Sequence, residues 1–144
     1  GSRTVHELHG STRRASCLQC GQLYSMDEIM ERVEKGENPP ICKEFEGNPC
    51  QGLIKPTTVF FGEPLPKAPW DASVDKSRET ALMIVIGSSL QVSPANSLPD
   101  IALQTGSELV IVDLMSTPFD SRAHLVINER AVLVAEMLEK KLAL

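Results

Sequence analysis

Four cysteines are the residues of this sequence whose type and spacing most directly predict chemistry. Cys17 and Cys20 form a C-x2-C pair, 21 residues separate Cys20 from Cys42, and seven separate Cys42 from Cys50. Four thiolates at such spacings suit a tetrahedral Zn²⁺ ion, and four protein ligands leave no open position for water or substrate. We predict one structural zinc per chain. The alternative is four unrelated buried thiols, or one free pair.

One histidine lies in a distinctive short segment, Glu7-Leu8-His9-Gly10-Ser11. Histidine has the pKa for proton transfer near neutral pH, which makes His9 a candidate general base. A histidine near the start of a chain is, however, more often a surface or core residue. His6 and His124 have no such context, and we interpret both as structural.

A third candidate is the segment from Phe60 to Pro66, in which the β-branched and aromatic run 57–61 ends at Gly62. An extended segment at the end of a strand can pair with a peptide through main-chain hydrogen bonds. Composition alone favours a simpler interpretation, an aromatic core strand followed by a loop.

Polar residues also follow two apolar runs that have the length of buried strands. Gly87, Ser88 and Ser89 come after the run 81–86, and Asp113 ends the run 108–113. In open α/β sheets ligands bind at the carboxyl ends of the strands, where hydroxyls and a carboxylate can hydrogen-bond a ribose. Ordinary turn chemistry would explain the same residues equally well. No G-x-G-x-x-G and no Walker A sequence is present.

The elements that must position these residues form an α/β pattern from residue 55 onward. We predict buried strands at 57–61, 81–86, 108–113 and 123–127, and helices at 70–80, 94–105 and 131–142. This order implies part of a doubly wound parallel sheet with helices on its faces. Residues 13–55 hold all four cysteines and little apolar periodicity, so we expect metal to organise them.

Composition excludes several classes of protein. The chain has 144 residues and a net charge of -5, and no basic face indicates nucleic-acid binding. No apolar run approaches the ~20 residues that span a bilayer. Without a leader-like segment, and with cysteines better suited to metal than to disulfides, we expect a cytoplasmic protein that contacts no membrane.

Taken in order, these motifs resemble the sirtuin (Sir2-type NAD-dependent protein deacylase) family. Residues 7–11 are similar to its catalytic histidine motif and the four cysteines to its structural zinc module. Residues 55–66 are similar to its acyl-lysine peptide loop and residues 86–95 to its ribose-contacting turn. The resemblance covers essentially the whole chain.

The resemblance implies a fold, a reaction and a set of site residues. The acyl oxygen of a modified lysine would attack the nicotinamide ribose of NAD, nicotinamide would leave, and His9 would act as general base on the ribose hydroxyls. Lysine and O-acyl-ADP-ribose are the products. The implied NAD-binding residues are Gly87, Ser88, Ser89, Asp113, Leu114 and Ala131. The implied residues for the acyl-lysine peptide are Val59, Phe60, Phe61, Gly62, Glu63 and Leu65.

Two segments of the family pattern are missing, and this shapes what we expect of this chain. The glycine-rich phosphate loop and the Gln-Asn-x-Asp segment that precede the histidine motif are not in this sequence. We therefore expect a partial catalytic domain, inactive alone, which associates through an open sheet edge. The expected segments are 1–12 with the catalytic histidine, 13–55 with zinc, and 56–144 with the second half of the Rossmann-like domain. A non-catalytic zinc-bearing binding fragment and a mono-ADP-ribosyltransferase are the alternatives.

Overall fold

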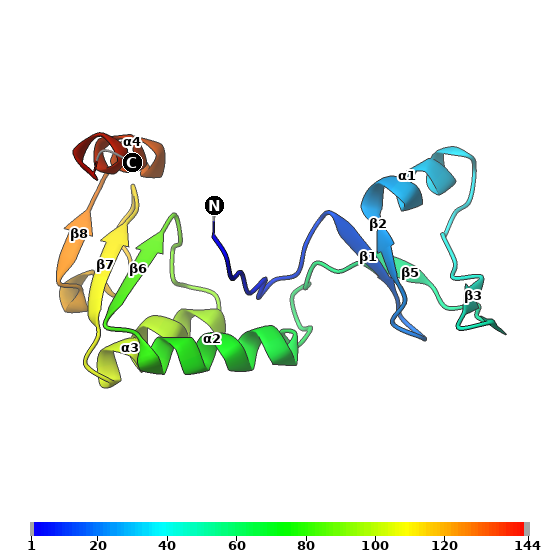
Figure 1. The fold of residues 1–144 in the computed structure, drawn as a ribbon, viewed down its shortest axis with the longest axis horizontal. Helices are drawn as coiled ribbons and strands as arrows, with labels where there is room; N and C mark the ends of the chain where they lie inside the picture. Colours follow the sequence, from blue (N-terminus) through cyan, green and yellow to red (C-terminus); the bar gives the residue numbers. More distant parts are fainter. Residues whose placement is uncertain (1, 143–144) are drawn as a thin grey trace. The chain divides into compact units, whose positions relative to one another are not determined.

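The computed structural model describes residues 2–142 of the chain. These residues fall into two compact units, Gly1–Pro69 and Trp70–Leu144, which Figure 1 shows in the colours of the sequence. Each unit has its own sheet and its own cluster of buried side chains.

A three-stranded antiparallel sheet forms the base of the first unit. Its strands, in the order β2-β1-β5, are β1 (Arg14–Cys17), β2 (Leu23–Ser25) and β5 (Ile54–Pro56). Ala15, in the central strand, pairs with Tyr24 on one side and with Pro56 on the other. The buried hydrophobic residues of this unit are Ala15, Cys17, Ile29, Cys42, Cys50 and Ile54. Because half of them are cysteines, the apolar core alone is small, as the weak apolar periodicity of residues 13–55 predicted.

One helix, α1 (Met26–Glu34), covers this small core. Its N-terminus is capped by the hydroxyl of Ser25, which accepts a hydrogen bond from the N–H of Asp27 at 3.2 Å. Ile29 is its one buried side chain among the described residues. The sequence analysis did not predict this helix, although Ser25 and Glu28 have the spacing of a capping box.

A short hairpin lies between the third and the fourth cysteine. Strand β3 (Glu44–Phe45) pairs antiparallel with β4 (Asn48–Pro49). The two turn residues, Glu46 and Gly47, have φ angles of 49° and 79°. Two successive positive φ values are the geometry of the tight hairpin turns that match the twist of paired strands.

The predicted strand at 57–61 is wrong. Regular pairing ends with β5 at Pro56, and residues 57–61 form no strand. Neither phenylalanine belongs to the core, since Phe60 is 55% and Phe61 96% exposed. This segment is therefore neither a core strand nor part of a ladder. The N–H of Val59 and the hydroxyl of Thr57 bond instead to the segment around His9.

The second unit is built on a parallel sheet, as predicted. Its strands β6 (Leu82–Ile86), β7 (Glu108–Val112) and β8 (Leu125–Ile127) lie in the order β6-β7-β8, and both pairings are parallel. The helical elements are α2 (Lys67–Glu79), which begins just before this unit, η1 (Ala95–Ser97), α3 (Leu98–Gln104), η2 (Asp120–Arg122) and α4 (Ala131–Leu142). The predicted helix at 94–105 is thus a 3-10 turn followed by a short α-helix, and the last strand begins two residues later than predicted.

Strand β6 has one half-buried face and one open face. Met83 and Val85 pack against the core of the unit. Leu82, Ile84 and Ile86 are 46%, 53% and 59% exposed. The prediction of a fully buried strand is therefore wrong, because Met83 and Val85 are only half-buried and no described residue of this unit covers the other face. Parallel strands normally have both faces covered.

Candidate functional site

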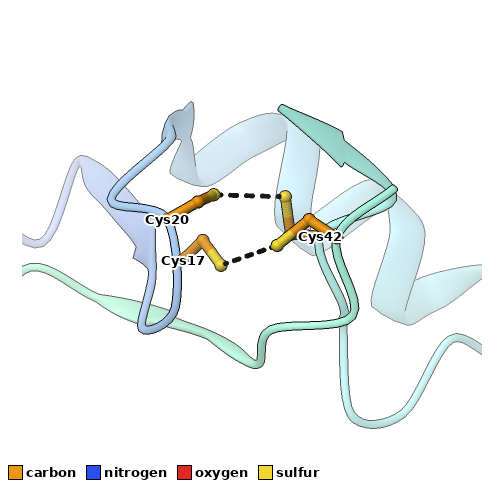
Figure 2. Close-up of side chains that lie close together, drawn as sticks. Cys17, Cys20 and Cys42 are labelled. Carbon is orange, nitrogen blue, oxygen red and sulfur yellow. Dashed lines mark hydrogen bonds between the residues drawn. The ribbon is translucent and has the colours of Figure 1, made fainter. Parts of the chain in front are cut away.

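The four cysteine sulfurs converge on one point of the first unit. All four Sγ atoms lie within 4.8 Å of one another. The Sγ atoms of Cys17 and Cys50 are 3.8 Å apart, and those of Cys20 and Cys42 are 3.7 Å apart. Figure 2 shows Cys17 and Cys20 on one loop, with Cys42 facing them from the opposite segment. The structure thus brings together residues from both ends of the module.

These separations fit a metal site and not a disulfide. A disulfide would require about 2.05 Å between sulfurs. Four ligands at the usual Zn–S distance of about 2.3 Å form a tetrahedron whose edges are about 3.8 Å long. Three of the cysteines are buried and the fourth, Cys20, is half-buried. The predicted four-cysteine site for a structural zinc therefore has the required donors, spacing and enclosure.

The local hydrogen bonds prepare one of these thiols for ionisation. The N–H groups of Cys20 and Gln19 donate toward the sulfur of Cys17, the latter at 3.3 Å, and lower the pKa of Cys17 to about 7. The N–H of Gln22 has the same effect on Cys20, but burial and the neighbouring thiols outweigh it and raise the pKa of Cys20 to about 12. A divalent cation would favour the thiolate form of all four.

The hairpin explains why seven residues separate Cys42 from Cys50. The N–H of Cys50 donates to the carbonyl of Lys43 at 3.0 Å, which closes the base of the β3–β4 hairpin. On the other side, the N–H of Cys42 donates to the carbonyl of Gly52 at 2.8 Å. The residues between the two cysteines fold into this hairpin. The Sγ atoms of Cys42 and Cys50 can therefore lie as close together as they would with fewer residues between them.

The segment around His9 lies alongside the segment that follows β5. The N–H of Val59 donates to the carbonyl of His9 at 3.0 Å. Two residues further on, the N–H of Ser11 donates to Oγ1 of Thr57 at 3.2 Å, and that hydroxyl donates to the carbonyl of Ser11 at 3.0 Å. Between them, Gly10 has a φ of 70°, and a side chain there would collide with the carbonyl of Thr57. The imidazole of His9 itself is exposed.

The segment from Phe60 to Glu63 is a tight turn closed by the carboxylate of Glu63. Both carboxylate oxygens of Glu63 accept from Nζ of Lys55, at 2.6 and 2.7 Å, and one accepts from the N–H of Phe60 at 3.0 Å. The ammonium of Lys55 lowers the pKa of Glu63 and lies 4.7 Å from the ring centre of Phe60. The side chain of Glu63 is thus committed to the turn itself, and it leaves Phe61 projecting outward.

The second unit has an open cleft of about 260 Å³ at the carboxyl ends of its strands. It is lined by Gly87, Val112, Asp113, Leu114, Glu129, Arg130, Ala131 and Val132. Four of the six residues predicted to bind the cofactor therefore meet here, on three different connections of the sheet. Ser88 and Ser89 are exposed residues that do not line this cleft. In Figure 1, α4 lies at the end of the sheet to which the strand arrows point.

Two charged residues of the cleft were missed by the sequence analysis. Glu129 and Arg130 lie between β8 and α4. No motif indicates them, although their place between a predicted strand and a predicted helix follows the general rule for ligands in α/β sheets. Asp113 is held by local bonds, since its carboxylate accepts from the N–H of Met115 at 2.9 Å and its carbonyl accepts from the side chain of Asn128 at 3.2 Å.

Comparison with known sequences places the chain in a family. The model described as the Sir2 family matches residues 1–94. The chain is 42% identical over 131 residues to NAD-dependent protein deacetylase 2 of Caldanaerobacter subterraneus subsp. tengcongensis, covering 91% of this chain and 48% of that protein. It is 40% identical over 133 residues to the NAD-dependent protein deacylase of Mycobacterium tuberculosis, covering 91% of this chain and 53% of that one.

Solved structures agree with the sequence comparison. A structure described as Sir2 bound to acetylated peptide has a TM-score of 0.89 at 38% identity, covering 98% of this chain and 57% of that one. A Sir2–p53 peptide–NAD+ complex has a TM-score of 0.88 at 38% identity, with 98% and 56% coverage. The chain belongs to the Sir2 family, and the resemblance inferred from its motifs is confirmed. It spans about half the length of the curated relatives that it matches.

Proposed function

We propose that this chain is the histidine-bearing and zinc-bearing part of an NAD-dependent protein-lysine deacylase. The observation that supports this most directly is the hydrogen bond between the carbonyl of His9 and the N–H of Val59. It joins the predicted general base to the predicted peptide-binding segment within one unit. Membership of the Sir2 family, whose matched relatives are described as NAD-dependent deacetylases and deacylases, supports the reaction type.

In this proposal each part of the chain has a distinct task. His9 takes a proton from a ribose hydroxyl of NAD, because a hydroxyl of high pKa is a poor nucleophile until a nearby base accepts its proton. The segment from Val59 to Leu65 binds the acyl-lysine peptide through its main chain, with Phe61 exposed to contact the acyl-lysine side chain. The cleft with Asp113 and Ala131 binds the adenosine side of NAD, and the zinc holds the first unit together.

Removing the imidazole tests this assignment. The assay uses a protein that joins this chain to the part of its relatives that it does not match, and measures nicotinamide and deacylated peptide together. His9→Ala should lower turnover by about 10²–10⁴-fold, the usual cost of losing a general base. His6→Ala, in the same segment, is the control and should retain activity. Normal turnover by a folded His9→Ala variant would remove His9 from the mechanism, and ADP-ribosylated peptide as the product would favour transferase activity instead.

We further propose that the chain alone does not turn over NAD, and that the open face of β6 binds a polypeptide equivalent to the unmatched part of its relatives. The exposed Leu82, Ile84 and Ile86 support this, because β6 is paired only with β7 among the described strands, and an edge strand with an apolar face favours association. Ile84→Glu should weaken a complex formed by mixing the two polypeptides, as measured by light scattering after size exclusion. Leu23→Glu, at an exposed position of the first unit, is the control. Equal complex formation by both variants would exclude this face.

A further inference from the structure

A chain of polar contacts leads from helix α1 to the sulfur of Cys42. The hydroxyl of Tyr24 donates to Sγ of Cys42 at 3.0 Å. The guanidinium of Arg32 lies 5.8 Å from the ring centre of Tyr24. Arg32 in turn donates to both carboxylate oxygens of Glu37, at 2.9 and 2.6 Å, in the two-pronged arrangement that gives arginine–carboxylate pairs their directionality.

The same pair of charges holds the backbone of the residue that precedes Cys42. Oε1 of Glu37 accepts a hydrogen bond from the N–H of Ile41 at 3.1 Å. Arg32 donates to the carbonyl of Ile41. Both polar backbone groups of Ile41 are therefore bound by the Arg32–Glu37 pair, and Cys42 follows in the chain with its own N–H bonded to the carbonyl of Gly52. The position of Cys42 is thus fixed from its backbone and from its sulfur.

Cys42 needs such support more than the first two ligands do. Cys17 and Cys20 share a tight C-x2-C loop, in which a backbone N–H already donates to the sulfur of Cys17 at 3.3 Å. Cys42 is separated from Cys20 by 21 residues and from Cys50 by seven. A ligand on a long connection loses more conformational freedom when metal binds. The donor to its sulfur is accordingly a side chain, Tyr24.

The contacts of Tyr24, Arg32 and Glu37 are partly buried, and such contacts are stronger than those on an open surface. Cys42 is fully buried, and the side chains of Arg32 and Glu37 are only 19% and 25% exposed. Solvent therefore screens the ion pair less than the exposed pair between Lys35 and Glu31 on the same helix, whose side chains are 77% and 69% exposed.

We propose that Tyr24, Arg32 and Glu37 are positioning residues for the structural zinc. Arg32 and Glu37 hold the backbone before Cys42, and the hydroxyl of Tyr24 donates to its thiolate and fixes the direction of the sulfur. Groups that orient metal ligands in this way typically contribute 10–100-fold to metal affinity. The proposal concerns the metal site alone and does not depend on the deacylase activity proposed above.

Tyr24→Phe isolates the hydroxyl, because it keeps the ring and its packing. Zinc affinity is measured on this chain by competition with a chromophoric chelator, and Co²⁺ is bound in parallel to record the thiolate-to-cobalt absorption. We expect zinc affinity to fall by about 10–100-fold and the cobalt band to shift, because one thiolate loses its hydrogen-bond donor. Glu31→Gln, at the exposed pair, is the control and should change neither. Wild-type affinity with an unshifted cobalt band in Tyr24→Phe would overturn the role of Tyr24.

Glu37→Gln provides a second, independent test that leaves every core side chain in place. It should increase the rate at which excess chelator removes zinc, because Ile41 and Cys42 lose their backbone anchor. In the double variant with Tyr24→Phe, the combined loss of affinity should be smaller than the product of the single losses, since both act on one sulfur. Independent effects, or unchanged zinc release in Glu37→Gln, would show that the pair stabilises only the loop. If Tyr24→Phe does not fold, zinc release from the single variant Glu37→Gln still tests the proposal.

Discussion

Gly52 offers the sharpest test of how closely the chain is packed around the metal site. Its backbone conformation is one that any residue adopts, so substitution by alanine adds only a methyl group. That methyl carbon would fall well inside van der Waals contact with Sγ of Cys17 and only 2.6 Å from Cβ of Gln19. Gly52 is also buried, which leaves the methyl group no route to solvent.

The size of the effect follows from these distances. Non-bonded carbon atoms prefer about 3.5–4.0 Å, so the methyl group and Cβ of Gln19 must separate by roughly 1 Å. Zinc–sulfur distances tolerate only about 0.2 Å. The Cys17 loop therefore cannot move far enough and keep its sulfur in the site. Overpacking of this kind costs about 1–3 kcal/mol. If that cost falls on the metal-bound state, zinc affinity in Gly52→Ala decreases by about 5–150-fold.

Chelator competition at equilibrium measures this decrease directly. Gln51→Ala, at the exposed neighbouring position, is the matched control and should bind zinc as the wild type does. Zinc affinity within about twofold of the wild type in Gly52→Ala would refute the reasoning, since about 1.4 kcal/mol corresponds to a tenfold change. That result would mean that the loop from Cys17 to Cys20 yields without displacing a ligand.

Three further outcomes are expected. Gly10→Ala should lower the free energy of unfolding of the first unit by at least about 2 kcal/mol, because the methyl group collides with the carbonyl of Thr57 at a positive φ; an unchanged urea midpoint would contradict this. Arg32 lowers the pKa of Glu37 to about 2 from 4.5, so this pair stabilises the fold above about pH 4.5 and the stabilisation is lost as the pH falls through about 2. The difference in urea midpoint between wild type and Glu37→Gln should therefore shrink across that range, and a constant difference would argue against the pair. Cys42→Ser should reduce the metal content below one equivalent, as measured by elemental analysis, whereas full occupancy would exclude Cys42 as a ligand.

The second unit was largely predictable because its signals are local. Outside this unit, the residue type of the four cysteines predicted that their sulfurs lie together, although they span residues 17–50. Within it, the apolar runs 81–86 and 108–113 contain parallel strands, as expected. Such patterns depend on residues within a few positions of one another, which a single sequence displays. The order of the motifs along the chain was also sufficient to indicate the family, which the match to the Sir2 model confirms.

Most of the failures depend on contacts between separate segments of the chain. The run 57–61 has strong strand propensity, yet the N–H of Val59 and the hydroxyl of Thr57 bond to residues 9–11. Propensity does not report such a distant partner, which tertiary context supplies. Helix α1 is an exception, because its signal is local: Met26, Ile29, Met30 and Val33 have helical spacing and follow the Ser25–Glu28 capping pair, yet the helix was not predicted. The ion pair between Glu63 and Lys55 could not be predicted either, since residue type alone does not distinguish a ligand-binding carboxylate from one that closes a turn.

The hairpin between Cys42 and Cys50 has a practical consequence for protein engineering. Its base is closed by a backbone hydrogen bond from Cys50 to Lys43, and its tip is the exposed turn at Glu46 and Gly47. Lengthening a loop whose ends are already fixed adds little entropic cost, because each doubling costs only about 0.6 kcal/mol. Exposed turns of this kind tolerate insertions best. A short epitope or a fluorophore-accepting peptide inserted at this tip should therefore leave the four sulfurs undisturbed, and it would give a handle for following the module in solution.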